Sequence, residues 1–156
     1  YITQATAPTL TNDMRGVFLA KSLGATTIAI GTHVSPATEA TLTAYPALDF
    51  AIRGEPEETV RELVDALEAI RRGTGSQTPG WRSVPEALAQ VKGIAYLRDG
   101  LMVATADRPF IADLDTLPIP RHELLPLKAY KLPVVAGGPL RGLPEVKATG
   151  ATGCRR

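Results

Sequence analysis

The chain has 156 residues, 44% of them hydrophobic, and its 17 basic and 16 acidic side chains leave a net charge of +1. This is the composition of a globular protein long enough to bury a core, and the balanced charge argues against nucleic acid or a membrane surface as a partner. The sequence contains no apolar run long enough to span a membrane, and its single cysteine excludes an internal disulfide. We therefore expect a cytoplasmic protein.

The first predicted unit is a strand followed by a helix. Residues 1–6 alternate in polarity and are rich in β-formers, and they end in the loop at residues 6–9. Thr11 or Asn12 can cap the helix that follows, and Gly24 is a typical helix stop. The residues predicted on its buried face are Met14, Val17 and Phe18.

Two more strand and helix pairs follow. The apolar run at residues 26–30 is typical of a buried strand, and Ser35 with Pro36 predicts a capped helix that ends near Ala44. Residues 48–53 predict the next strand, and a longer amphipathic helix follows residues 54–59. The residues predicted on its buried face are Val60, Leu63, Val64, Leu67 and Ile70.

This alternation predicts an α/β fold with a parallel, doubly wound sheet, because a crossover helix returns the chain to start each parallel neighbour. Ligands of such sheets bind outside the carboxyl ends of the strands. Three loops are therefore candidates for a binding site, at residues 6–9, 31–33 and 54–57.

The remaining chain predicts a hairpin and a connector. Residues 94–97 and 101–105 are strand-like runs around the turn at Asp99 and Gly100, which is typical of a β-hairpin. Prolines then recur from residue 109 to residue 144, too often for a regular helix or a central strand. We predict an extended, proline-rich linker there.

Several of these segments resemble one known family. The runs IGTHVSP (residues 30–36) and LDFAIRGEPEET (residues 48–59) resemble the second half of the cobalamin-binding domain of B12-dependent radical S-adenosylmethionine enzymes. GIAYLRDG (residues 93–100) resembles the short hairpin of that family, and DLDTLPIPR (residues 113–121) resembles its linker to the catalytic barrel. The segments occur in the order that the family has.

The resemblance implies a domain organisation. Residues 1–90 correspond to the C-terminal part of a flavodoxin-like or Rossmann-like cobalamin-binding domain, 91–107 to its hairpin, 108–148 to the linker and 149–156 to the start of a cluster-binding loop. Two further strand and helix units are then expected before Tyr1. Cys154 corresponds to the first of three cysteines that hold a [4Fe–4S] cluster in the family, which makes it a metal ligand by resemblance.

The resemblance also suggests cofactor-binding residues, each with a simpler alternative. Those in the three loops are Thr6, Ala7 and Pro8, then Gly31, Thr32 and His33, then Gly54 and Glu55. Thr6, Ala7 and Pro8 also suit a plain turn into a helix. We interpret His33 as a pocket-wall or hydrogen-bonding residue, not an axial ligand, although a loop histidine of no function is the commoner case. Capping explains Glu57 and Glu58 completely, whereas Glu55 is harder to explain that way.

The implied function is the cobalamin-binding portion of a radical S-adenosylmethionine methyltransferase or oxidative cyclase. Its partners are then cobalamin and a small-molecule substrate, with a [4Fe–4S] cluster and S-adenosylmethionine in the complete enzyme. The catalytic barrel is absent from this chain. The alternative is a flavodoxin-like domain that binds a nucleotide or flavin, or has a regulatory role, without radical chemistry, although no glycine-rich phosphate motif follows any predicted strand. A scaffold domain without cofactor binding is a third possibility.

Overall fold

The computed structural model describes residues 1–74 and 85–124. The chain divides into two units, Tyr1–Phe110 and Ile111–Arg156. In the second unit the described residues form two short 3₁₀ helices, η2 (Leu114–Thr116) and η3 (His122–Leu124). Asp113 caps η2 by accepting a hydrogen bond from the Asp115 backbone N–H at 3.0 Å. The predicted linker is therefore interrupted by brief helical turns.

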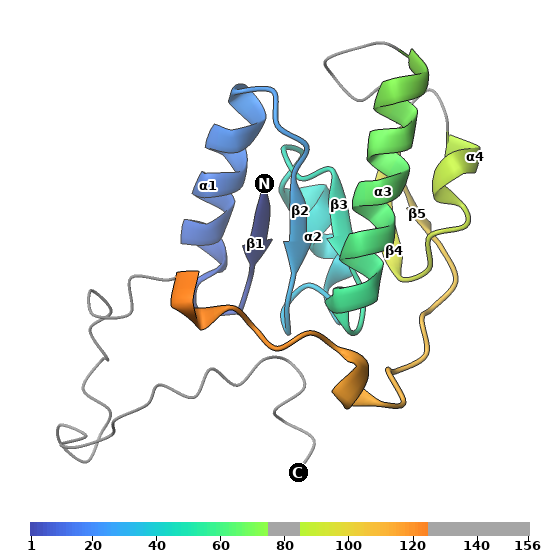
Figure 1. Ribbon diagram of the computed structural model, residues 1–156. Coiled ribbons are helices and arrows are strands. Elements are labelled where there is room, and N and C mark those ends of the chain that lie inside the picture. The colour runs from blue at the N-terminus through green and yellow to red at the C-terminus, as the bar shows by residue number, and fades with distance from the viewer. Residues whose placement is uncertain (75–84, 125–156) are drawn as a thin grey trace, which may run out of the picture. The chain divides into compact units, whose positions relative to one another are not determined.

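The first unit is built on a five-stranded mixed sheet in the order β1-β2-β3-β4-β5 (Figure 1). The strands are β1 (Ile2–Gln4), β2 (Ile28–Ile30), β3 (Phe50–Ile52), β4 (Ile94–Arg98) and β5 (Leu101–Ala104). The strands β1, β2 and β3 run parallel, whereas β4 pairs antiparallel with both β3 and β5. The predicted parallel strands and hairpin are confirmed, while the doubly wound topology stays a prediction.

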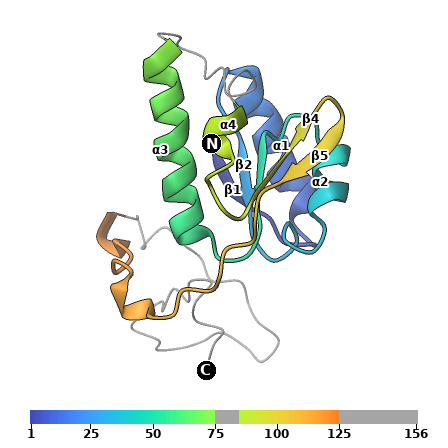
Figure 2. The same ribbon diagram turned by 90° about the vertical axis from the view of Figure 1, so that its right-hand side faces the viewer.

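Helices cover both faces of this sheet. The helices α1 (Leu10–Ser22) and α2 (Thr38–Ala44) lie on one face, and α3 (Pro56–Thr74) and α4 (Pro85–Leu88) lie on the other (Figure 2). The core is divided accordingly into two clusters of buried side chains. Because alternate residues of a strand point to opposite faces, β2, β3, β4 and β5 each contribute to both clusters.

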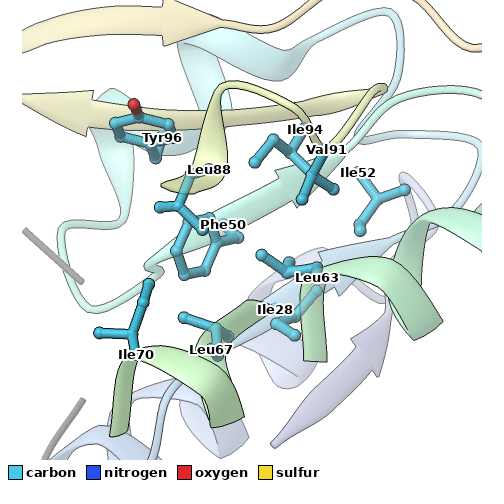
Figure 3. Packing of buried hydrophobic residues seen from close by; sticks show 10 residues of the cluster. All are labelled: Ile28, Phe50, Ile52, Leu63, Leu67, Ile70, Leu88, Val91, Ile94 and Tyr96. Atoms are coloured by element: carbon cyan, nitrogen blue, oxygen red, sulfur yellow. The ribbon is translucent and has the colours of Figure 1, made fainter. Parts of the chain in front are cut away.

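The larger cluster lies under α3 and α4. Leu63, Leu67 and Ile70 of α3 and Leu88 of α4 pack on Phe50 of the central strand (Figure 3). The Phe50 ring meets the Tyr96 ring edge-on, with ring centroids 5.8 Å apart. On the opposite face the strands carry small side chains, among them Ala29, Ala51 and Ala95, on which Met14, Val17 and Leu42 of the helices pack.

Two predicted core positions are wrong. Phe18 has 68% of its side chain exposed, because the buried face of α1 passes through Met14 and Val17, and the next residue lies about 100° further around the helix. Val64 is 44% exposed for the same reason, one position after the fully buried Leu63. The other predicted positions on α3 are buried or packed against the core.

Both predicted capping arrangements are also wrong. The N-cap residue of α1 is Thr9, not Thr11 or Asn12, and its side chain makes no capping hydrogen bond to the helix backbone. The N-cap residue of α2 is Ala37, two positions after Ser35, so the Ser35 hydroxyl does not cap this helix. The Thr9 hydroxyl bonds to Asp13 and within its own loop instead, and the Ser35 hydroxyl joins two loops, as described below.

A buried polar network ties α1 to the start of the strands. The Asp49 carboxylate, with no exposed surface, accepts two hydrogen bonds of 2.7 Å from the Lys21 ammonium. It also accepts one of 3.0 Å from the backbone N–H of Thr27, whose hydroxyl accepts from the Asp49 N–H at 2.9 Å. Both oxygens of this carboxylate thus accept hydrogen bonds, so the network holds the last turn of α1 against the starts of β2 and β3.

Candidate ligand-binding site

The carboxyl ends of the three parallel strands meet at one edge of the sheet, at the lower end in Figure 1. The loops at residues 5–9, 31–37 and 53–55 all leave from this edge. We refer to it as the carboxyl edge. All eight cofactor-binding positions predicted from the sequence lie on it, while Cys154 lies outside the described residues.

The β1–α1 loop holds a directed chain of hydrogen bonds. The Thr9 hydroxyl donates to the Asp13 carboxylate at 2.6 Å, and it lies 2.9 Å from the Thr6 hydroxyl and 3.3 Å from the Thr6 backbone N. Thr9 has only one hydroxyl proton, and a charge-assisted bond to a carboxylate is the strongest use of it. The Thr6 hydroxyl therefore donates to Thr9, and its own lone pairs remain available as acceptors at the edge.

Gly31 brings the first two loops into backbone contact. It has a φ of +115°, and a Cβ atom at this position would lie 2.6 Å from the backbone O of Ala5. The same oxygen accepts a hydrogen bond from the backbone N–H of His33 at 3.4 Å. Val34, completely buried, anchors the loop in the core below. Only glycine allows the two loops to approach this closely.

Ser35 joins the second loop to the third. Its Oγ accepts a hydrogen bond from the backbone N–H of Gly54 at 3.0 Å. Gly54 has a φ of +79°, and nothing lies within 4 Å of the place where its Cβ would be. The backbone is thus exposed at Gly54, and a flat ligand can approach it directly.

The contacts between the loops involve some of the predicted binding residues and not others. The loops of Thr6 and Gly31 touch through Ala5, and Gly54 joins them through Ser35. His33 and Glu55 are half-buried beside these contacts, whereas Ala7, Pro8 and Thr32 take no part in the hydrogen bonds described above. Within the described residues, no three His, Cys, Asp or Glu side chains form a group that could hold a metal ion.

The carboxyl edge presents several kinds of polar group. It offers hydroxyl oxygens, an exposed glycine backbone, a carboxylate and an imidazole, which together suit a large polar ligand that has both hydrogen-bond donors and acceptors.

In the described part of the chain, no helix is long and apolar enough to cross a membrane.

Sequence reasoning missed the residues that support these loops. The sequence predicts Ser35 as a cap, places Thr9 in the candidate loop at residues 6–9 without an individual role, and gives no role to Asp13. The spacing of Thr9 and Asp13 indicates their contact, because residues four apart at the start of a helix lie on the same side of it. Arg108, described further below, had no local indication, because its partners lie at least 46 positions away in the sequence.

The fold and this edge define an α/β domain with a candidate ligand site at the carboxyl ends of its parallel strands. No family model matches the chain. Over 101 residues, 65% of this chain, it is 35% identical to an uncharacterized methyltransferase of Pyrococcus horikoshii, of which the match covers 19%.

The chain is also similar to two enzymes named anaerobic magnesium-protoporphyrin IX monomethyl ester cyclase. It is 37% identical over 89 residues to that of Synechocystis, with 57% of this chain and 15% of the relative covered. It is 33% identical over 87 residues to that of Cereibacter sphaeroides, with 56% and 12% covered. The chain thus spans less than a fifth of the length of these relatives.

Proposed function

We propose that this chain is a cobalamin-binding portion of a larger methyltransferase or cyclase that uses radical S-adenosylmethionine chemistry. The observation that carries the proposal is the carboxyl edge, where Gly31 lets two loops meet at Ala5 and Gly54, held by Ser35, leaves its backbone uncovered. The similarity to relatives named for two different activities supports it. A segment common to a methyltransferase and to cyclases suits a shared cofactor better than a substrate specific to one of them.

The residues at the edge fit the chemistry of a corrin. A corrin is broad and flat and carries carboxamide groups, which both donate and accept hydrogen bonds. The Thr6 hydroxyl accepts, the Glu55 carboxylate accepts, and the open backbone at Gly54 allows close approach. When bound, cobalamin supplies methyl transfer or assists oxidation, and the protein orients it and excludes water.

The remaining predicted residues also have roles in the proposed cofactor site. His33, half-buried beside Gly31, forms part of the pocket wall and does not ligate cobalt. Thr32, Ala7 and Pro8 form the rim that faces the cofactor. Cys154 is the first cysteine of a loop that holds a [4Fe–4S] cluster, where S-adenosylmethionine binds in the complete protein.

Glycine amides provide the test, because they mark both edges of the sheet. In the chain labelled with ¹⁵N-glycine, addition of cobalamin is expected to shift the amide resonances of Gly31 and Gly54. Gly24, which follows α1, and Gly100, in the β4–β5 turn, lie at the opposite edge and serve as internal controls.

The ligand panel distinguishes the alternative. If flavin mononucleotide shifts the amide resonances of Gly31 and Gly54 while cobalamin does not, the hypothesis of a flavin-binding domain replaces the proposal of a cobalamin-binding portion. If cobalamin shifts none of these amides in this chain or in a longer natural protein that contains it, the proposal is refuted. The visible spectrum of the bound cobalamin reports independently whether a histidine coordinates the cobalt.

A further inference from the structure

The segment after the hairpin returns to the carboxyl edge. Since β4 and β5 are antiparallel, the chain leaves this edge at Gly93 and comes back to it at Ala106. There the Gly93 N–H donates to the Ala106 carbonyl at 2.8 Å, and the Gly93 carbonyl accepts from the Arg53 N–H at 2.8 Å. The residues that follow β5 thus lie beside the residue that precedes the Gly54 loop.

Two arginines attach this segment to both ends of that loop. Arg53, immediately before the loop, forms an ion pair with Asp107 at 2.6 Å, and its guanidinium also donates to the Thr105 carbonyl. Arg108 reaches across to the beginning of α3, immediately after the loop. Gly54 and Glu55, between Arg53 and α3, are therefore held on both sides by the same short segment, residues 105–108.

Arg108 is the more deeply buried of the two, with 10% of its side chain exposed. Its Nε donates to the Thr59 hydroxyl at 2.8 Å, one terminal nitrogen donates to Glu58 at 3.1 Å, and the other donates to Glu62. All three nitrogens of the guanidinium are used, each on a different residue of α3. The planar fork of arginine suits this arrangement, whereas the single ammonium of lysine does not.

The backbone at Gly93 is closely packed against Arg53 and Thr59. Gly93 has a φ of +78°, and a Cβ there would lie 3.2 Å from both the Arg53 carbonyl and the Thr59 hydroxyl. Arg108 loses most of its hydration, whereas Glu58 and Glu62 keep 40% and 39% of their side chains exposed. Such ion pairs contribute little net stability, so their main effect is on geometry. A binding loop that is already held in place loses less conformational entropy when a ligand binds.

We propose that residues 105–108 form a brace for the Gly54 loop and that Arg108 is a positioning residue of the ligand-binding edge. The role in ligand binding depends on the function proposed above, whereas the brace itself does not. Arg108 lies two residues before the boundary of the first unit at Phe110. The brace thus connects the ligand-binding loop to the point where the chain continues into the linker.

The test of the brace needs no ligand. In Arg108→Gln, hydrogen exchange of the Gly54 amide, which donates to Ser35, is expected to accelerate roughly tenfold, as for the loss of one charge-assisted hydrogen bond. Exchange at Gly24 and Gly100 should not change, which separates a local effect from global destabilisation. Arg98→Gln, an exposed arginine at the other edge, is the matched control. Unchanged exchange at Gly54 overturns the brace.

The ligand measurement then tests the positioning role. Cobalamin affinity is expected to fall roughly tenfold in Arg108→Gln, to recover in part in Arg108→Lys, and to match the wild type in Arg98→Gln. Wild-type affinity in Arg108→Gln, together with faster exchange at Gly54, overturns the positioning role. If the wild-type chain and the longer protein bind no corrinoid while Gly54 exchange responds to Arg108, the proposed function is refuted and the brace is supported.

Discussion

Replacing Gly31 with alanine tests the contact on which the carboxyl edge depends. The new Cβ would lie 2.6 Å from the Ala5 carbonyl oxygen, a backbone atom of a fully buried residue that has no side-chain rotation with which to move away. Gly24→Ala is a matched control, because Gly24 also has a positive φ, +83°, but nothing lies within 4 Å of its Cβ position. The difference between the two variants therefore isolates the close approach of the loops.

The magnitudes follow from these two environments. An L-residue at positive φ costs about 1–2 kcal/mol, partly offset by the lower entropy of the unfolded chain, and this contribution is present in both variants. Overpacking against a fixed group adds about 1–3 kcal/mol in Gly31→Ala alone. We expect Gly31→Ala to lower the free energy of unfolding by roughly 2 kcal/mol more than Gly24→Ala, a difference of roughly 10 °C in melting temperature.

Urea unfolding followed by far-UV circular dichroism measures this difference, and equal slopes of the two transitions would show that the comparison is valid. The cobalamin-dependent shift of Gly54 provides a second readout. It should be lost in Gly31→Ala and kept in Gly24→Ala, because the second loop holds Gly54 through Ser35. The reasoning fails if the two variants have the same stability within about 0.5 kcal/mol and both retain the shift.

Two further substitutions test other parts of the unit. Asp49→Asn should lower the free energy of unfolding, measured in urea, by about 2–4 kcal/mol, because it removes the buried charge that accepts both hydrogen bonds from Lys21. The control is Asp65→Asn, at an exposed position, which should differ from the wild type by less than about 0.5 kcal/mol. Equal effects of the two substitutions would contradict the role of the network. Ser35→Ala should weaken cobalamin binding about fivefold by titration, since Gly54 loses its acceptor. Ser35→Thr, which keeps the hydroxyl, should bind more tightly than Ser35→Ala, and wild-type affinity in the alanine variant would be evidence against this coupling.

The elements of the first unit were predictable because their patterns are local. The β-branched run before Gly31 and the helical spacing of Leu63, Leu67 and Ile70 each report burial directly, and the structure confirms both. Phe18 shows the limit of such reasoning. A large apolar side chain within a helix indicates burial only if a neighbouring element covers that side of the helix, and the sequence does not contain this information.

The contacts that hold the loops of the candidate site could not be predicted from the sequence for a related reason. A serine before a proline predicts a cap from its immediate neighbours, yet the Ser35 hydroxyl accepts from an N–H that is 19 residues away. Arg108 precedes a proline in a segment that is typical of a linker, and its partners on α3 are 46 to 50 residues away. Contacts of this kind are formed by the sheet topology, so they become visible only when the strands are placed.

The position of β1 at the end of the sheet has a consequence for amide protection. The Ala5 N–H donates to Ile30 at 2.8 Å, and the Tyr1 carbonyl accepts from Ile28 at 2.9 Å, so the odd-numbered residues of this strand direct their backbone groups toward β2. The backbone groups of Ile2 and Gln4 point the other way. In hydrogen exchange the first residues should therefore alternate between slow and fast. In a longer protein where another strand pairs with β1, the alternation disappears, so one spectrum of either protein reports whether this strand is an edge.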